Sequence, residues 1–253
     1  MMKNNRLLLT GAGFTKNYGA PLAAEMGSRI FNKLNNPDLR EIIRKCKFNY
    51  EEAYQKVFEG KFSAEDRQDI KEAIQKVFGD IEKDTESYNY YSARNLCKEL
   101  MKKFTKTHDG SGAIFTLNQD VFIETHCHDA NIQCIYPYVA QMFVPNQPYK
   151  IDNISIKTKI SKYERYVAKH NGDLYLSYFK LHGSINWRLE SNDSLLITGG
   201  NKLAYINKHP ILEEYQNQFA AFLNKPNTKL LIVGYGFQDM HINNLLQKAS
   251  SDA

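Results

Sequence analysis

The stretch Arg6–Met26, RLLLTGAGFTKNYGAPLAAEM, decides the fold expected for this chain. Three leucines and a threonine precede a glycine pair around Ala12, and a helical segment follows Pro21. This order predicts a strand, a tight turn and a helix. Because Gly11 and Gly13 lack a Cβ atom and helix N-termini favour negative charge, the turn can bring backbone N–H groups close to a nucleotide phosphate.

The glycine turn matches neither of the two common nucleotide loops. A dinucleotide fingerprint needs a glycine where this chain has Lys16, and an acidic residue closing a second strand about 20 residues later. A Walker A run is absent from the sequence. These departures disfavour a dehydrogenase, and they leave open that the turn is only a tight connection.

Length and composition favour a globular protein without membrane segments. The 253 residues can form one large α/β domain or two smaller ones. No apolar run reaches the roughly 20 residues of a membrane helix, and the apolar N-terminus is too short for a signal peptide. We therefore expect a cytoplasmic protein without membrane partners.

Metal binding is not expected from the cysteines and histidines. The four cysteines form no C-x-x-C pair. His126, Cys127, His128 and Cys134 lie within nine residues, but neighbours on a helix point in different directions and cannot all reach one tetrahedral ion. We read them as ordinary side chains.

The net charge of +5 is mild, and its excess is local. Lysine and arginine dominate the segments 94–106 and 150–169. Either segment could face a nucleic acid or an acidic partner. A solvated helix face or loop is the more common origin of such a charge run, and we favour it for both segments.

The middle of the first half predicts a helical insertion over residues 37–108. Pro37 opens one helix, Asn49 caps a second, and Ser63 precedes a third that Gly79 is expected to end. Apolar residues recur there at helical spacing, which is typical of core packing.

The remaining strand patterns complete a sheet. Apolar runs occur at Ala113–Leu117, Gln133–Tyr136, Leu174–Leu181 and Lys229–Val233, with helical patterns between them. Strands alternating with helices predict an α/β fold with a Rossmann-like, doubly wound and mostly parallel sheet, formed by residues 1–253 as a single domain.

Two further segments carry weaker patterns. Residues 137–172 contain three prolines and a lysine-rich run, which indicate a second insertion or long loop, with a helix at Lys162–Lys169. Leu195–Ile197 and Leu203–Ile206 predict a small hairpin.

Polar corners follow four of the proposed strands. They are Gly11-Ala12-Gly13, Asn118-Gln119-Asp120, His182-Gly183 and Gly234-Tyr235-Gly236. Ligands bind beyond the carboxyl ends of the strands in such sheets, so these corners predict a nucleotide site with one acid/base group. Taken singly, the histidine could be structural and the Asn or Asp could cap the next helix.

Four ordered stretches carry a family resemblance. GAGFTKNYGAPLA, FTLNQD, KLHGSINW and LLIVGYGFQDMHIN resemble the signature stretches of the SIR2-like (sirtuin-related) family. In detail the chain is similar to the bacterial SIR2-like domains of anti-phage systems, which hydrolyse NAD+. Those domains are paired or fused with short Argonaute and APAZ proteins, HerA-type ATPases or other sensing domains, and the opening stretch is most similar to the Argonaute-associated members.

The resemblance implies an NAD+ glycohydrolase (NADase) that releases nicotinamide and ADP-ribose. NAD+ is then the substrate and no metal is needed. Such an enzyme would act in anti-phage defence by abortive infection, so low basal activity and control by a homo-oligomer or a sensing partner are expected. No sensing domain follows the last motif in this sequence. The trigger is therefore expected in a partner chain that can make an indirect link to nucleic acid, in a further C-terminal region, or in self-assembly.

The resemblance also assigns roles to individual residues. Asn118 and His182 match the catalytic pair, with Asn118 beside the nicotinamide ribose. NAD+-binding residues are Gly11, Ala12, Gly13, Phe14, Asp120, Gly234, Gly236 and Asn243. Asp120 would hold the nicotinamide carboxamide, Ala12 and Gly13 the pyrophosphate, and Asn243 the adenosine ribose. Trp187 is expected to pack in the core or wall, Asp239 to cap a helix, and Thr15 is left undecided.

One departure weakens the deacylase alternative. Sirtuin deacylases carry a zinc-stapled module with two C-x-x-C pairs, and residues 126–206 contain no such pairs. Two rival functions stay open: an NAD-dependent protein deacylase, and a non-catalytic subunit that binds nucleotides or nucleic acid.

Overall fold

A computed structural model describes residues 4–87, 91–105, 110–139, 141–145, 147–151 and 174–251. The helix expected at Lys162–Lys169, most of the second insertion and nearly all of the basic segment 150–169 lie outside these ranges. Within the described ranges, none of the helices has both the length and the apolar character needed to cross a bilayer.

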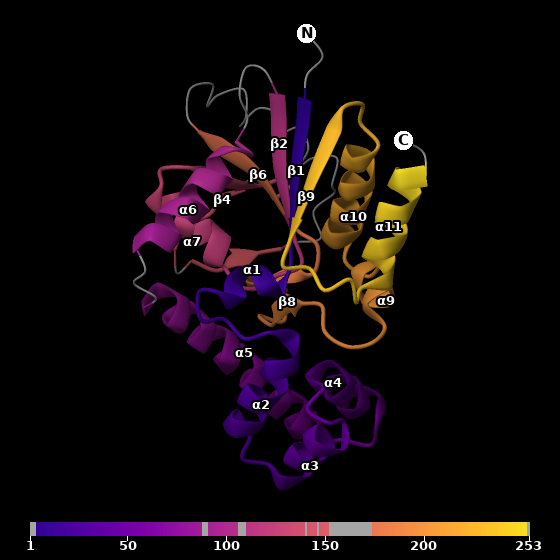
Figure 1. The fold of residues 1–253 in the computed structure, drawn as a ribbon. Coiled ribbons are helices and arrows are strands. Elements are labelled where there is room, and N and C mark those ends of the chain that lie inside the picture. Colours follow the sequence, from indigo (N-terminus) through magenta and orange to yellow (C-terminus); the bar gives the residue numbers. More distant parts are fainter. Residues whose placement is uncertain are drawn as a thin grey trace.

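The centre of the molecule is a six-stranded sheet with the order β4-β3-β6-β2-β1-β9 (Figure 1). Five strands run parallel, and only β4 is antiparallel to its neighbour. The strands are β1 (Asn4–Thr10), β2 (Gly110–Thr116), β3 (Gln133–Tyr136), β4 (Gln141–Met142), β6 (Tyr175–Lys180) and β9 (Thr228–Val233). The expected parallel α/β sheet is thus confirmed.

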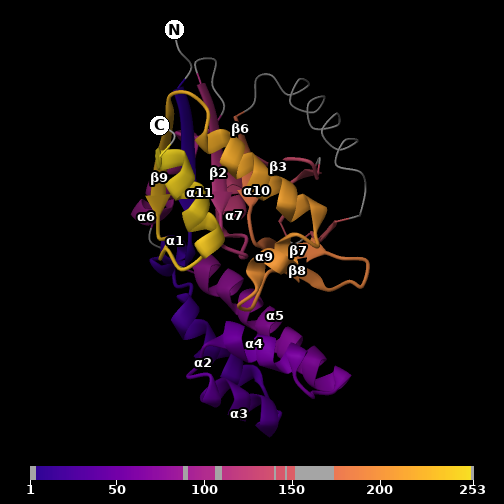
Figure 2. The same cartoon turned by 90° about the vertical axis from the view of Figure 1, so that its right-hand side faces the viewer.

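Helices cover both faces of this sheet. On one face lie α6 (Tyr91–Lys102) and α7 (Phe122–Asp129), and on the other α10 (Pro210–Leu223) and α11 (Met240–Ser251) (Figures 1 and 2). This double cover explains the run Leu7, Leu8 and Leu9, which is fully buried although its side chains alternate between the two faces.

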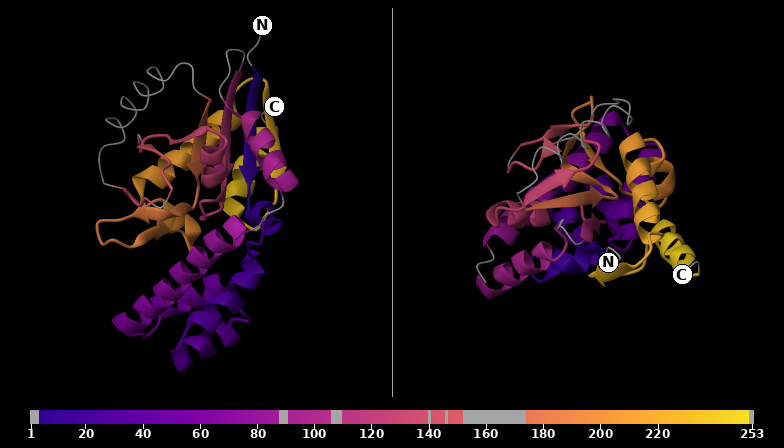
Figure 3. Two further views of the ribbon diagram at one scale, coloured as in Figure 1. Left: turned by 90° about the vertical axis from the view of Figure 1, so that its left-hand side faces the viewer. Right: turned by 90° about the horizontal axis from the view of Figure 1, so that it is seen from above.

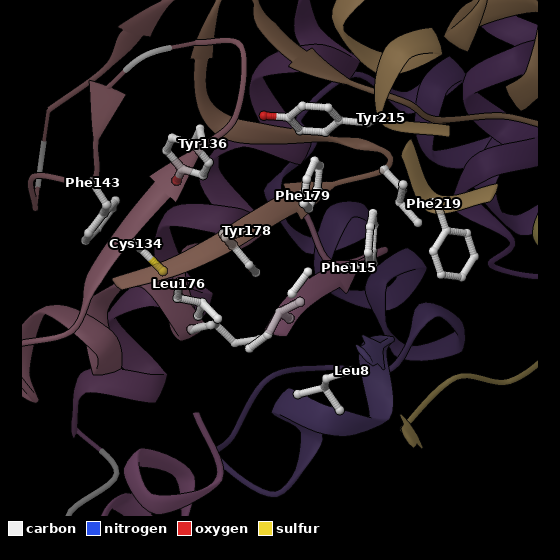
Figure 4. Packing of buried hydrophobic residues seen from close by; sticks show 14 of the residues in the cluster. Leu8, Phe115, Cys134, Tyr136, Phe143, Leu176, Tyr178, Phe179, Tyr215 and Phe219 are labelled. Atoms are coloured by element: carbon white, nitrogen blue, oxygen red, sulfur yellow. The ribbon is translucent and has the colours of Figure 1, made fainter. Parts of the chain in front are cut away.

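Aromatic side chains fill the space between the sheet and α10 (Figure 4). The Phe115 ring stacks on Phe179 with centroids 4.5 Å apart and contacts Phe219 at 4.8 Å. Trp187 is fully buried against Tyr136 and Tyr215. Its expected place in the core is therefore confirmed.

A second core belongs to four helices that lie beyond the carboxyl ends of the strands (Figures 1 and 3). They are α2 (Ala23–Lys33), α3 (Pro37–Lys45), α4 (Tyr50–Glu59) and α5 (Ala64–Ser87). The helix starts were predicted correctly: Pro37 is the first residue of α3, and the Asn49 side chain accepts a hydrogen bond from the N–H of Glu52.

The end of α5 was predicted wrongly, because the helix continues through Gly79 to Ser87. Glycine costs a helix about 1 kcal/mol relative to alanine. Burial of Val77, Phe78 and Ile81 on both sides of Gly79 outweighs that cost.

The predicted hairpin is also wrong. Leu203–Ile206 belongs to α9 (Lys202–Ile206), whose Ile206 is fully buried. β8 (Ser194–Leu196) pairs instead with β7 (Gly183–Arg188), in a three-stranded sheet completed by β5 (Tyr149–Lys150). A run of four residues is too short for its pattern to separate helix from strand, and packing against α10 decides for helix.

Candidate functional site

All four polar corners meet at one edge of the central sheet. A cavity of about 690 Å³ lies there, between the strand ends and the helices α2 and α4. Eight of the ten predicted site residues line it: Gly11, Ala12, Gly13, Asn118, Asp120, His182, Gly234 and Gly236. The sheet order explains this, because β9 and β2 flank β1 on opposite sides and parallel strands end at the same edge.

The first and last glycine loops are in direct contact. The N–H of Gly13, in the short helix α1 (Ala12–Lys16), donates to the carbonyl oxygen of Gly234 at 2.9 Å. A Cβ atom on Gly234 would lie 2.0 Å from the nitrogen of Phe14, and one on Gly11 2.8 Å from the Gly234 oxygen. The glycines are needed here for the close approach of two backbones.

The Asn118 corner is held by hydrogen bonds to its own strand β2 and to the helix α1. The hydroxyl of Thr116 accepts from the Asn118 N–H at 3.0 Å, and the Asn118 side-chain amide lies 3.4 Å from the Thr15 hydroxyl. The adjacent Gln119 side chain donates to the carbonyl oxygens of His182 and Ile197. Asn118 and His182 are therefore positioned by one hydrogen-bonded unit, which includes the previously undecided Thr15.

Asp120 caps the helix that follows it. One carboxylate oxygen accepts from the N–H of Phe122 at 3.0 Å, at the start of α7. Burial raises the pKa of Asp120, and the nearby Lys180 partly offsets that rise. Asp120 also lines the cavity, so the same side chain can cap α7 and face a ligand.

A buried ion pair lies behind this corner. The Lys180 ammonium donates to the backbone oxygen of Asp120 and lies 2.8 Å from a carboxylate oxygen of Glu124, which also accepts from the Tyr136 hydroxyl at 2.9 Å. The side chains of Lys180 and Glu124 are fully buried. The pair fixes the backbone that carries Asp120.

His182 faces a second histidine. Its Nε2 lies 3.1 Å from Nε2 of His241, in the first turn of α11. Burial lowers the pKa of His182 to about 3, and burial also lowers the pKa of His241. Both rings are thus neutral at pH 7, and one donates to the other.

Charged residues surround the histidine pair. Lys202, at the start of α9, lies 2.9 Å from Asp239 and 2.9 Å from Glu51 of α4. Burial alone would raise the pKa of Asp239, but His182, Lys202 and His241 lower it overall. The ion pair of Glu51 and Lys202 also joins α4 to α9 beside the cavity.

Two predicted residues do not line the cavity. The Phe14 ring is buried and packs on Tyr18 and Phe122. The Asn243 amide donates to the Phe237 carbonyl at 2.8 Å and its oxygen accepts from the Tyr235 hydroxyl at 2.9 Å. Their contacts to NAD+ stay predictions, while Asn243 visibly braces the last glycine loop.

The sequence reasoning missed His241, Lys202, Glu51 and Lys180. His241 is two residues after the singled-out Asp239, and Lys180 is a lysine at the end of an apolar strand. A histidine so close to Asp239 and a lysine inside an apolar strand are both features of the sequence that could have indicated these residues. Glu51 and Lys202 gave none, because charged residues in the first turn of a helix are ordinary on a surface.

Among the described residues, a cluster of possible metal ligands occurs at His182, Asp239 and His241. The compact segment from His126 to Cys134 forms no such cluster. His126 is buried with Nδ1 against the Phe122 carbonyl, and His128 is exposed.

Comparison with known proteins adds one match. The model of the family described as SIR2-like domain matches residues 112–253, more than half of the chain, and takes in Asn118, Asp120, His182 and the last glycine loop. Among curated proteins, none is significantly similar in sequence.

Proposed function

The chain belongs to the SIR2-like family, and we propose that it is an NAD+ glycohydrolase that releases nicotinamide and ADP-ribose. One observation carries the proposal: two glycine loops, Asn118 and a neutral, buried His182 line the same cavity. The loops suit the phosphates of a dinucleotide, and the pair suits work on a ribose.

The chemistry fits these side chains. Cleaving the N-glycosidic bond passes through an oxocarbenium-like state, so the protein must orient the ribose, hold the leaving ring and prepare a nucleophile. When Nε2 of His182 carries the imidazole proton and donates a hydrogen bond to His241, the lone pair on Nδ1 of His182 can act as the base. That nitrogen takes a proton from a ribose hydroxyl or the attacking water, which Asn118 positions.

The setting we propose is bacterial anti-phage defence in the cytoplasm. Hydrolysis of NAD+ drains a metabolite that the whole cell shares, so the activity has to be restrained until infection. We propose that self-assembly or a sensing partner, such as a short Argonaute with APAZ or a HerA-type ATPase, provides that control.

The test is nicotinamide release from NAD+ by the purified protein, at high concentration and together with the product of a neighbouring gene. We expect His182→Ala and Asn118→Ala to lower turnover by about 10²- to 10⁴-fold, with NAD+ binding measured by calorimetry retained. His128→Ala and Asn244→Ala, both at exposed positions, are matched controls and should keep full turnover.

The rivals predict other outcomes. Nicotinamide release that depends on an acylated peptide would identify a deacylase. NAD+ binding without turnover in any condition, together with salt-sensitive nucleic-acid binding, would identify a non-catalytic subunit. Either result would overturn the glycohydrolase.

A further inference from the structure

Three side chains at the wall of the cavity have the arrangement of a metal site. The Nε2 atoms of His182 and His241 lie 3.1 Å apart, and one ligand atom from each of His182, Asp239 and His241 lies within 4.8 Å of the others. Two nitrogens that share a tetrahedral Zn²⁺ at 2.0–2.1 Å are roughly 3.3 Å apart. The two imidazoles are therefore already near the spacing that one ion requires.

The backbone holds these ligands in place. Asp239 precedes α11, and its N–H and carbonyl oxygen both contact the Tyr235 hydroxyl. His241 lies two residues later in the first turn, while His182 comes from the end of β6. The ligands thus come from two rigid parts of the fold, and a small turn of the Asp239 side chain would bring its oxygen to the ion.

The local charge favours a cation. Lys202 is neutralised by two carboxylates, Glu51 and Asp239, at 2.9 Å each. This trio carries a net charge of −1, and the neutral imidazoles add none. Lys202 contacts one oxygen of Asp239, so the second oxygen can serve as the ligand while Glu51 continues to hold the lysine.

We propose that His182, Asp239 and His241 bind one divalent transition-metal ion, with Zn²⁺ as the best fit. Two imidazole nitrogens and one carboxylate oxygen are ligands of Zn²⁺, whereas Mg²⁺ and Ca²⁺ prefer oxygen alone. His182 and Asp239 line the cavity, so a water or a substrate hydroxyl completes the coordination from that side.

The bound ion acts as an inhibitor, a consequence that rests on the proposed function. Ligation through Nε2 places the imidazole proton of His182 on Nδ1. His182 then has no lone pair left to accept a proton from the ribose or from water. His182 therefore cannot bind the metal ion and act as the general base at the same time.

The test is direct metal binding by the full chain after treatment with chelator. Co²⁺ is titrated while the visible absorption of four-coordinate Co²⁺ is followed, and Zn²⁺ is then used to displace it. We expect one ion per chain. His241→Gln and Asp239→Asn should each weaken binding by at least about tenfold, and His128→Ala, which removes an exposed histidine, should not change it.

Unchanged Co²⁺ binding in His241→Gln and His182→Gln, or no four-coordinate spectrum with the wild type, would overturn the site. Circular dichroism checks that each variant is folded. If His241→Gln or Asp239→Asn is not folded, the conclusion rests on His182→Gln. A separate arm measures nicotinamide release with Zn²⁺ and then with added EDTA. Because the spectra need no turnover, failure of the glycohydrolase proposal would leave the metal test decisive.

Discussion

The N–H of Gly13 donates a 2.9 Å hydrogen bond to the carbonyl oxygen of Gly234. Through this contact, loops more than two hundred residues apart in the chain form one rigid wall of the cavity. Gly234 has a φ of +70°, a conformation that side chains rarely adopt. The wall therefore depends on glycine at this position.

Gly234→Ala should destabilise the protein by about 2–4 kcal/mol, because its Cβ would overlap the backbone of Gly13 and Phe14 while the backbone is held at positive φ. Gly236→Ala is the matched control, since its nearest neighbour would be the Gln238 side chain at 3.9 Å. Urea unfolding measures both. Equal unfolding free energies for the two variants would contradict the close-approach argument.

Asp120→Asn should separate the two roles of this side chain. The amide oxygen can still accept from the N–H of Phe122, so stability should stay close to that of the wild type. Loss of the charge should weaken NAD+ binding by about tenfold or more. Asp120→Ala should lose both stability and binding. Calorimetric titration with NAD+ and thermal melts measure affinity and stability for both variants. Unaltered NAD+ affinity in Asp120→Asn would show that the Asp120 charge has no part in binding and that the residue only caps α7.

Lys180→Met should cost about 3–5 kcal/mol, because it leaves the Glu124 carboxylate buried without its partner. Adding Glu124→Leu should recover a large part of that loss. Lys56→Met breaks an exposed pair with Glu52 and should change the unfolding free energy far less, because solvent screens that pair. Urea unfolding of all the variants tests this, and a double variant no more stable than Lys180→Met would count against it.

The free energy of unfolding should fall as the pH drops below 6.5. Burial lowers the pKa of His182 from 6.5 to about 3, so between these values the unfolded chain takes up a proton that the native chain does not. The slope from this group approaches about 1.4 kcal/mol per pH unit. Urea unfolding in EDTA at pH 7, 6 and 5 measures it.

His182→Gln should lower the slope of unfolding free energy against pH by up to about 1.4 kcal/mol per pH unit, the contribution of one proton. His128→Gln, at an exposed position, should leave the slope unchanged. Parallel slopes for the wild type and His182→Gln would show that the histidine is protonated in the native state.

Much of the fold followed from local pattern. The fully apolar run Leu7–Leu9 is typical of a strand buried on both faces, and capping by Asn49 set a helix start that the structure confirms. The errors fell where the local signal was short or isolated. Gly79 was read as a stop and Leu203–Ile206 as a strand, and packing against neighbouring elements overrode both readings.

The residues of the candidate site also fall into two groups, those that the sequence indicated and those that only the structure showed. Glycines, Asn118, Asp120 and His182 could be read from the strand ends, because the edge of a parallel sheet is set by strand direction alone. Lys202 and Glu51 could not, and the signal at His241 did not identify its partner, since the importance of all three residues comes from which partners they meet.

By itself, the sequence determined that the chain forms a parallel α/β sheet, with its polar corners at one edge. Periodicity and strand ends are local properties, so the sequence carries them directly. Only the tertiary structure decided that Gly13 meets Gly234, that His182 faces His241, and that Lys202 bridges two carboxylates. Those contacts join residues distant in the chain, and they depend on strand order and helix packing, which no local pattern specifies.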